Sequence, residues 1–344
     1  MKPHDMRPHA SPGGSRRRRP PVIATRRMVA LTGGLCAGAG GMVLIRHLSA
    51  GSAGSGSPLL YSTGDIQVNN VSGTSSGSQI AGMEGLNTIL IKDSTLESTV
   101  TGKTASDPIA NGIIIYQSTS GGAEASTGEH ATFQSADSTL SSAIGSGSMF
   151  YFTNTTADVV PQNNTELDFD TDAATLINAS GNDSNNWGST GSNGATVNFT
   201  GRDQTLAGDV TADTISSVDL YLLDGTAWTG AATITDNAAA GSGTGTASDV
   251  PITVNVDGTS TWVVAKDTTI SALNVASGGG DGNTVTIVAN GKTVVSGSGD
   301  VTVTVTGSYS TSVSAGSDTE LSRDTIDRSE FDSRFGTSTA WTMA

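Results

Sequence analysis

Short apolar runs separated by small polar turns recur along most of the chain. Between Thr88 and Thr156 one phrase returns four times, as a brief apolar run followed by a turn built on Asp or Asn with Ser or Thr. Two of these turns hold Asp93 and Asp137, which are 44 residues apart, and a third holds Asn154, 17 residues later. Read as two turns of about 22 residues and one of 17, these spacings are typical of the coils of a solenoid.

The same pattern predicts short strands and no helix of any length. Several runs are continuously apolar, such as 113–116 and 149–152, which indicates strands that are covered on both sides. The predicted strands are Asp65–Val68, Thr88–Ile91, Gly112–Tyr116, Ala131–Gln134, Met149–Phe152, Thr165–Phe169, Ala174–Ile177, Ala195–Phe199, Val218–Leu222, Ile252–Val256, Thr261–Val264, Thr284–Val288 and Val301–Thr306.

An all-β fold, a single right-handed parallel β-helix, satisfies this pattern without helices. Its coils hydrogen-bond about 4.8 Å apart, so side chains at equivalent positions stack. We expect about a dozen coils, with one polar ladder formed by Asp93, Asp137, Asn154 and Asn178. The alternative is a string of antiparallel sandwiches, since Asn290-Gly291 between two Thr/Val-rich runs is typical of a hairpin.

The first fifty residues differ from the rest and predict an export signal over 1–50. Arg26 and Arg27 precede a weakly apolar segment at 28–45, an arrangement that resembles a twin-arginine signal. Cleavage fits after Ala50 or after Ala53; an uncleaved membrane anchor is the alternative. We therefore divide the chain into this signal, a Gly/Ser linker at 51–57, a β-helix domain at 58–316 and a C-terminal cap or tail at 317–344.

Charge and composition exclude several functions. The net charge is −15, and residues 1–50 hold nine basic residues and a single acid, so the remainder carries −23. Nucleic acid is therefore not an expected partner, because phosphate contacts need clustered Lys and Arg. Cys36 is the single cysteine, and His130 is the single histidine after residue 50, which excludes a Cys/His zinc site. We expect a monomer without a cofactor.

Asp168, Asp170 and Asp172 are the candidate acids for catalysis. On a strand they would face one side about 6.5–7 Å apart, a separation that suits an inverting glycosidase. Such a pair also needs a nearby base, and Arg202 is the nearest basic residue in the sequence. The alternative interpretation is a solvated strand face beside a turn.

Two further candidates lie in the loop that follows. Asn182 and Asp183 are possible oxygen ligands for Ca²⁺, although the loop lacks the regular acid spacing of an EF-hand. Trp187 is a candidate platform for stacking on a sugar ring. The alternatives are an ordinary loop and a tryptophan that covers a gap in the coil surface. We interpret Trp228 and Trp262, which lie between Thr-rich runs, as packing residues.

Residues 58–344 resemble secreted or surface β-helix proteins of the adhesin-like type found in Gram-positive actinobacteria, a group that shares the pectate-lyase-like superfold. The phrases that carry the resemblance are 79–86, 179–188 and 335–339. It implies an extracellular or cell-surface location and glycans or host surface components as partners. The sequence therefore favours an exported, non-enzymatic adhesin or carbohydrate-binding scaffold. The alternative is a polysaccharide lyase or glycoside hydrolase that uses Asp168 and Asp170.

Overall fold

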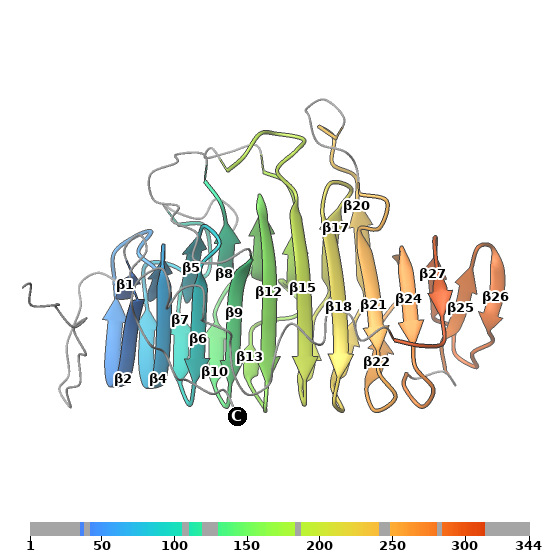
Figure 1. The fold of residues 1–344 in the computed structure, drawn as a ribbon, viewed down its shortest axis with the longest axis horizontal. Helices are drawn as coiled ribbons and strands as arrows, with labels where there is room; N and C mark the ends of the chain where they lie inside the picture. The colour runs from blue at the N-terminus through green and yellow to red at the C-terminus, as the bar shows by residue number, and fades with distance from the viewer. Residues whose placement is uncertain are drawn as a thin grey trace, which may run out of the picture.

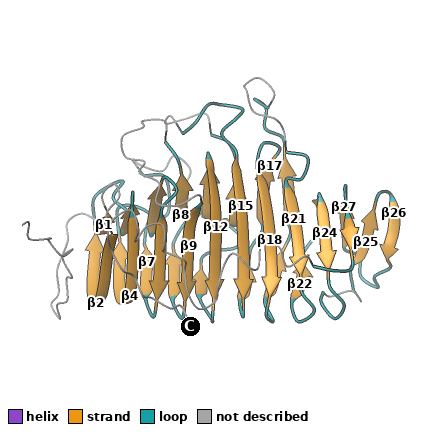
Figure 2. Ribbon diagram, in the orientation of Figure 1, coloured by secondary structure: helices purple, strands orange, loops and turns teal. Residues whose placement is uncertain are grey.

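The computed structural model describes residues 35–37, 42–104, 110–118, 130–182, 187–240, 248–280 and 284–313. These residues form 28 strands. No helix long and apolar enough to cross a membrane occurs among them. Within this part of the chain every strand pairing is parallel except that of β25 with β26 (Figures 1 and 2). The chain is thus an all-β parallel β-helix, as the sequence predicts.

The longest face of the solenoid, which we call sheet 1, stacks ten strands in chain order (Figure 1). Its strands are β2 (Met42–Ser52), β4 (Asp65–Ser75), β6 (Thr88–Lys92), β9 (Ala131–Ala136), β12 (Thr155–Gln162), β15 (Ala195–Arg202), β18 (Ser217–Leu223), β21 (Ile252–Val256), β24 (Ala272–Val275) and β28 (Tyr309–Ser310).

Two further faces close each coil. Sheet 2 contains β1 (Leu35–Ala37), β3 (Leu60–Ser62), β5 (Ala81–Glu84), β8 (Asn111–Tyr116), β11 (Ser148–Thr153), β14 (Thr175–Ala179), β17 (Val210–Asp213) and β20 (Ala232–Thr235). The third face, which we call sheet 3, has two parts. The strands β7 (Thr95–Ser98), β10 (Thr139–Ser142) and β13 (Glu166–Asp168) are joined to sheet 1 through the long strand β4, whereas β16 (Thr205–Ala207), β19 (Ala227–Gly230) and β22 (Thr261–Val264) form a separate three-stranded sheet.

The core is a narrow apolar column between these faces. Its residues on sheet 1 are stacked in register and almost completely buried: Ile66, Ile89, Phe133, Val159, Phe199, Leu220, Val254 and Leu273. From sheet 2, Phe150 packs edge-on against Phe133 and Phe199, with ring centroids 5.6 and 5.3 Å away. Burying each such ring contributes about 1.5–3 kcal/mol, so the column can stabilise the fold with few aromatic residues.

A polar ladder runs along the corner where sheet 1 turns into sheet 3. Its residues have positive φ, which Asn and Asp tolerate better than other non-glycine residues. Asp93 and Asp137 belong to it, as predicted, with φ of 48° and 49°. The backbone N–H of Asp93 donates to the carbonyl of Ala136, and that of Asp137 to Asn163. The remaining members of the ladder are Asn70, Asn163, Asn164, Asp203 and Asp224.

Two of the predicted ladder residues lie elsewhere. Asn154 has a φ of 50° but occupies a different corner, between β11 of sheet 2 and β12 of sheet 1. Asn178 lies inside β14, where it pairs with Tyr151 and Thr211. The prediction was wrong for both. Asparagine occurs at more than one kind of corner and also inside strands, so the residue type alone does not show which position it occupies.

The coils are less uniform than the sequence suggests. Thr88 pairs directly with Thr132, so one coil takes the 44 residues that we had assigned to two. The apolar runs at 112–116 and 149–152 belong to sheet 2, whereas those at 88–91 and 131–134 belong to sheet 1. Coil length falls to 19 residues between Thr253 and Ala272. Sheet 1 consequently has ten strands rather than about a dozen.

Both ends of the described structure depart from regular coils. At the N-terminal end β2 pairs with β4 over its whole length, and Ile45, Leu48 and Ala50 pack on the core. The β-helix therefore starts before the predicted boundary at Pro58. At the C-terminal end β23 (Thr268–Ile270), β25 (Thr286–Ala289), β26 (Lys292–Val295) and β27 (Thr302–Val305) form a separate sheet. Its antiparallel pair turns at Asn290-Gly291, which confirms the predicted hairpin.

Candidate functional site

A polar pocket of about 610 Å³ opens where the strands of sheet 2 end and the chain turns toward sheet 1. Ser180 to Asn182 follow β14, Asp213 ends β17, and Thr235 to Ala239 follow from the end of β20. Because these three strands are neighbours in sheet 2, segments far apart in sequence meet at one edge. The lining is completed by Lys103, Thr190, Gly191 and Asn193.

Asp213 ties the coils together beneath the pocket. One carboxylate oxygen accepts from the backbone N–H of Gly181 at 2.8 Å and from the side-chain amide of Asn237 at 2.7 Å. The other accepts from the Ser216 hydroxyl at 2.7 Å and the Ile215 N–H at 3.2 Å. With four donors and 4% exposure, this carboxylate has a structural role and positions the pocket wall.

Asn193 presents a polar atom that the fold does not satisfy. Its Nδ2 donates to the carbonyl of Trp187 at 2.7 Å and to that of Asn182. Its Oδ1 is buried and has no hydrogen-bond partner within the described structure, and the residue is 1% exposed. A buried acceptor without a donor costs about 1–3 kcal/mol, so the wall of the pocket holds an unsatisfied polar atom.

The exposed rim of the pocket carries both charges. Lys103, Thr190 and Asp236 line the pocket and are exposed to solvent. The ammonium of Lys103, the hydroxyl of Thr190 and the carboxylate of Asp236 supply hydrogen-bond donors and acceptors to the pocket. Such a set of groups can form hydrogen bonds with a polar ligand.

Trp187 lies beside this pocket but is not a free platform. It is 6% exposed and packs with Ile114 and Tyr151. Its ring centroid lies 4.7 Å from that of Tyr116, at an interplanar angle of 34°. The indole therefore covers a gap on the outer side of sheet 2, which was the alternative interpretation, and offers no open face for a sugar in this conformation.

Beneath Trp187 the phenols of Tyr61 and Tyr116 both donate to the carboxylate of Glu84, the latter at 3.4 Å. Glu84 is 7% exposed. Burial, together with the neighbouring Tyr61 and Glu84, raises the pKa of Tyr116 far above its ordinary value. The cluster is a buried polar network on the sheet surface.

The predicted acid pair is not assembled by the described contacts. Asp168 ends β13, where one carboxylate oxygen accepts from the Ser141 hydroxyl at 2.8 Å. Asp170 lies after the strand, and its Oδ1 accepts from the backbone N–H of Asp172 at 3.0 Å. Arg202 forms an ion pair with Asp224 at 2.8 Å and contacts neither acid through any bond among the described residues. The alternation that would align Asp168 with Asp170 ends with the strand.

The calcium prediction rests on one described residue. The Nδ2 of Asn182 donates to the Tyr151 hydroxyl at 3.1 Å, and Asp183 lies outside the described residues. No group of three or more His, Cys, Asp or Glu that could hold a metal occurs in the described part. Arg26 and Arg27 of the predicted export signal also lie outside it.

Sequence reasoning missed a polar row on the outer face of sheet 1. Asp158 accepts from His130 Nδ1 at 2.7 Å and from the Asn198 amide at 2.8 Å. Asn198 pairs in register with Asp219, which pairs with Thr253. Burial raises the pKa of Asp219, against the opposing effect of a hydrogen bond from Thr253. Only the register brings these residues together, since they are spread over five segments of the chain.

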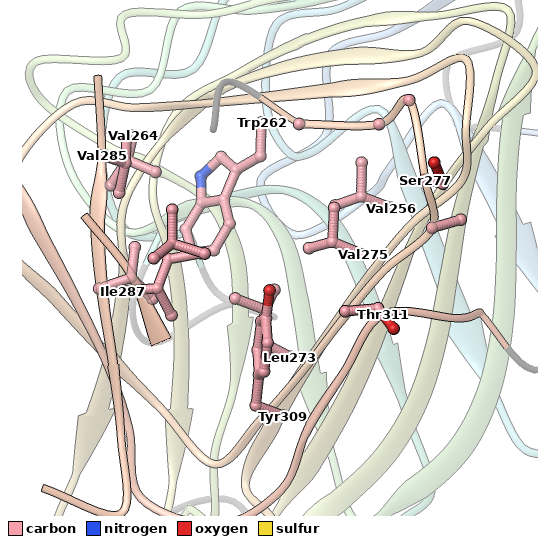
Figure 3. Close-up of a pocket in the computed structure, with 16 residues that line it drawn as sticks. Val256, Trp262, Val264, Leu273, Val275, Ser277, Val285, Ile287, Tyr309 and Thr311 are labelled. Carbon is pink, nitrogen blue, oxygen red and sulfur yellow. The ribbon is translucent and has the colours of Figure 1, made fainter. Parts of the chain in front are cut away.

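A second pocket lies at the C-terminal end of the core (Figure 3). It has a volume of about 350 Å³, and its wall is mostly apolar, with Trp262, Leu273, Val285, Ile287 and Tyr309 around it. It continues the apolar column and presents few polar groups, so it does not suit a sugar.

A scan against protein-family models and searches of curated proteins and of solved structures found no match.

Proposed function

We propose that the protein is an exported, non-enzymatic β-helix scaffold at the cell surface that binds glycans in the polar pocket. The observation that carries this proposal is the buried, unpartnered Oδ1 of Asn193 in a pocket lined by amides, hydroxyls and charges. Export is supported by the paired arginines Arg26 and Arg27 and the apolar segment that follows them. Because β2 (Met42–Ser52) belongs to the β-helix, the proposal does not include cleavage after Ala50 or Ala53.

Neutral or amino-sugar glycans are the favoured ligands. The chain carries a net charge of −15, which repels polyanionic chains such as polyuronates. The exposed carboxylate of Asp236 favours a cationic or hydroxyl-rich ligand. The ammonium group of Lys103 supplies a positively charged hydrogen-bond donor on the same rim. The recurring Asn and Asp of the solenoid corners are explained by their backbone conformation, so they carry none of this specificity.

The alternative function, a lyase or hydrolase that uses Asp168 and Asp170, gains no support from the contacts described above. Both acids are exposed and each is engaged by a local donor. A binding function needs no acid–base pair, which is why we favour it.

The test is binding of the exported chain to an array of neutral, acidic and amino-sugar oligosaccharides, followed by product analysis of each bound glycan. We expect retained, uncut glycan of the neutral or amino-sugar class. Lys103→Ala and Asp236→Ala should each weaken binding roughly tenfold, the loss expected for one charge-assisted hydrogen bond.

Lys292→Ala is the matched control, because Lys292 is exposed on β26, outside the pocket, and should leave affinity unchanged. Equal binding by the Lys103/Asp236 double variant would place the glycan elsewhere. Cleaved product that disappears in Asp168→Asn would restore the enzymatic alternative.

A further inference from the structure

One outward-facing row of sheet 1 is buried along seven consecutive strands. Side chains alternate across a strand, so a residue between two core residues points away from the core. Leu90 lies between Ile89 and Ile91, both of which belong to the core column. The residues in register with Leu90 are at most 9% exposed, and with it they form the row Gln67, Leu90, Gln134, Val160, Thr200, Tyr221 and Asn255. Thr200 follows Val160 in the row because the preceding residues, Val159 and Phe199, are paired.

The described residues do not account for this burial. Leu90, Val160 and Tyr221 belong to none of the three apolar clusters that the described residues form. Gln67 Nε2 and Gln134 Oε1 are buried without a hydrogen-bond partner. A sheet face in contact with water leaves part of each side chain accessible, so another part of the chain must cover this row.

Length excludes the short internal segments as the cover. Those outside the described residues are 38–41, 105–109, 119–129, 183–186, 241–247 and 281–283, and each is held at both ends. From β4 to β28 the row crosses nine strands, which span roughly 38 Å at 4.8 Å per strand. Two terminal segments, 1–34 and 314–344, are long enough to follow it.

We propose that the C-terminal segment 314–344 is a strap that lies along this outward row of sheet 1. The described chain reaches the row at its C-terminal end, because Ser310 of β28 is in register with Asn274, the residue that follows Asn255 in the row. The 31 residues of the segment span about 46 Å as a helix and about 100 Å when extended, so either conformation covers the row.

The composition of the strap matches the surface. It supplies large apolar side chains for Leu90, Val160 and Tyr221, namely Leu321, Ile326, Phe331, Phe335 and Trp341. Arg323, Arg328 and Arg334 are spaced along it. The next outward row of sheet 1 contains the acids Asp65, Asp158 and Asp219. The segment holds six acids besides its three arginines, a net charge of −3, so its fit to sheet 1 rests on its apolar side chains and not on charge. Residues 1–34 are rich in Pro and Arg and lack aromatic residues altogether.

Thiol labelling tests the strap independently of glycan binding. In a Cys36→Ser background, Thr200→Cys places a thiol in the buried row, and Thr229→Cys places one at an exposed position of β19 as a control. In the full chain we expect the thiol at position 200 to react roughly a hundredfold more slowly than the control. Ending the chain after Val313 should abolish this protection, and adding a synthetic 314–344 peptide should restore it.

Two further variants test whether truncation exposes position 200 by unfolding the chain and whether segment 1–34 is the cover instead. Val254→Cys, in the core, must stay protected in the truncated chain. Removing 1–34 should leave position 200 protected. Protection that persists after loss of 314–344, or that disappears with 1–34, would overturn the proposal. Should truncation unfold the chain, photo-leucine in the intact chain decides, since Leu90 must cross-link to a peptide from 314–344 and not from 1–34.

Discussion

The indole rings of Trp228 and Trp262 stack inside the solenoid with centroids 4.8 Å apart and planes 11° from parallel. They occupy paired positions of β19 and β22, so the spacing is the rise of one coil. Each indole N–H donates one coil back, Trp228 to the Gly208 carbonyl at 2.9 Å and Trp262 to Gly230 at 3.0 Å. A Cβ on Gly230 would collide with the Gly208 carbonyl, so the small residue makes the close approach possible.

Trp228→Ala should therefore destabilise the fold by about 3–5 kcal/mol, because it leaves a large cavity in the core. Urea unfolding of single and double variants measures this and yields a coupling of about 0.5–1.5 kcal/mol between Trp228 and Trp262. Val263→Ala on β22, the strand of Trp262, is the control; its side chain is 41% exposed and its loss should change stability by less than about 0.5 kcal/mol. A Trp228→Ala variant as stable as this control would contradict the stacking account.

The corner ladder predicts a small effect for one substitution and a larger loss of stability for another at the same site. Asp137 has a φ of 49° and an exposed side chain. Asp137→Gly should leave stability within about 1 kcal/mol, because glycine adopts positive φ freely. Asp137→Val should cost about 1–2 kcal/mol, since a β-branched residue is strained there. Thermal unfolding measures both, with Thr205→Val on exposed β16 as the control. Equal effects of Gly and Val would show that φ is not the determinant.

The ladder also shows how far sequence predicted the fold. Periodic apolar runs were sufficient to predict a parallel β-helix, because burial on both faces leaves a distinctive continuous pattern. The assignment of each run to a face was not predictable, because sheets 1 and 2 both bury the same residue types. Asp93 and Asp137 were placed on one corner correctly, yet the 44 residues between them form one coil with long connections. Length alone does not distinguish an insertion from an extra coil.

The pocket was less predictable than the fold. Sequence reasoning pointed to the stretch from Asp168 to Trp187, and Asn182 does line the pocket. Asn193 and Asp213 were missed because their roles depend on which strands are neighbours in sheet 2. The signal that was available was the long connection after β14, since coils keep short turns unless a loop has another role.

Tyr116 provides a test of the buried network beneath Trp187. Burial, Tyr61 and Glu84 raise its pKa, so the folded chain keeps the phenol protonated where the unfolded chain ionises it. That contribution to stability is complete below the unfolded pKa of 10.0 and is lost as pH rises beyond it. Tyr116→Phe should therefore lessen the fall in melting temperature between pH 9 and pH 11, conditions that bracket an ordinary phenol pKa of about 10. A fall identical to that of the unmodified chain would exclude this role.

Asp219 and Asp257 should respond to pH in opposite directions. Burial raises the pKa of Asp219, so its favourable contribution is complete below the unfolded pKa of 3.8 and is lost as pH rises through the higher folded value. Asp219→Asn should thus raise the melting temperature at neutral pH and change it little at about pH 3.

Burial also acts to raise the pKa of Asp257, but hydrogen bonds from the backbone of Asp224 and Thr259 lower it overall. Asp257→Asn should therefore destabilise the fold at neutral pH, with the loss fading in acid. Melting curves across that range measure both, and two variants that shift in the same direction would show that burial does not dominate at Asp219.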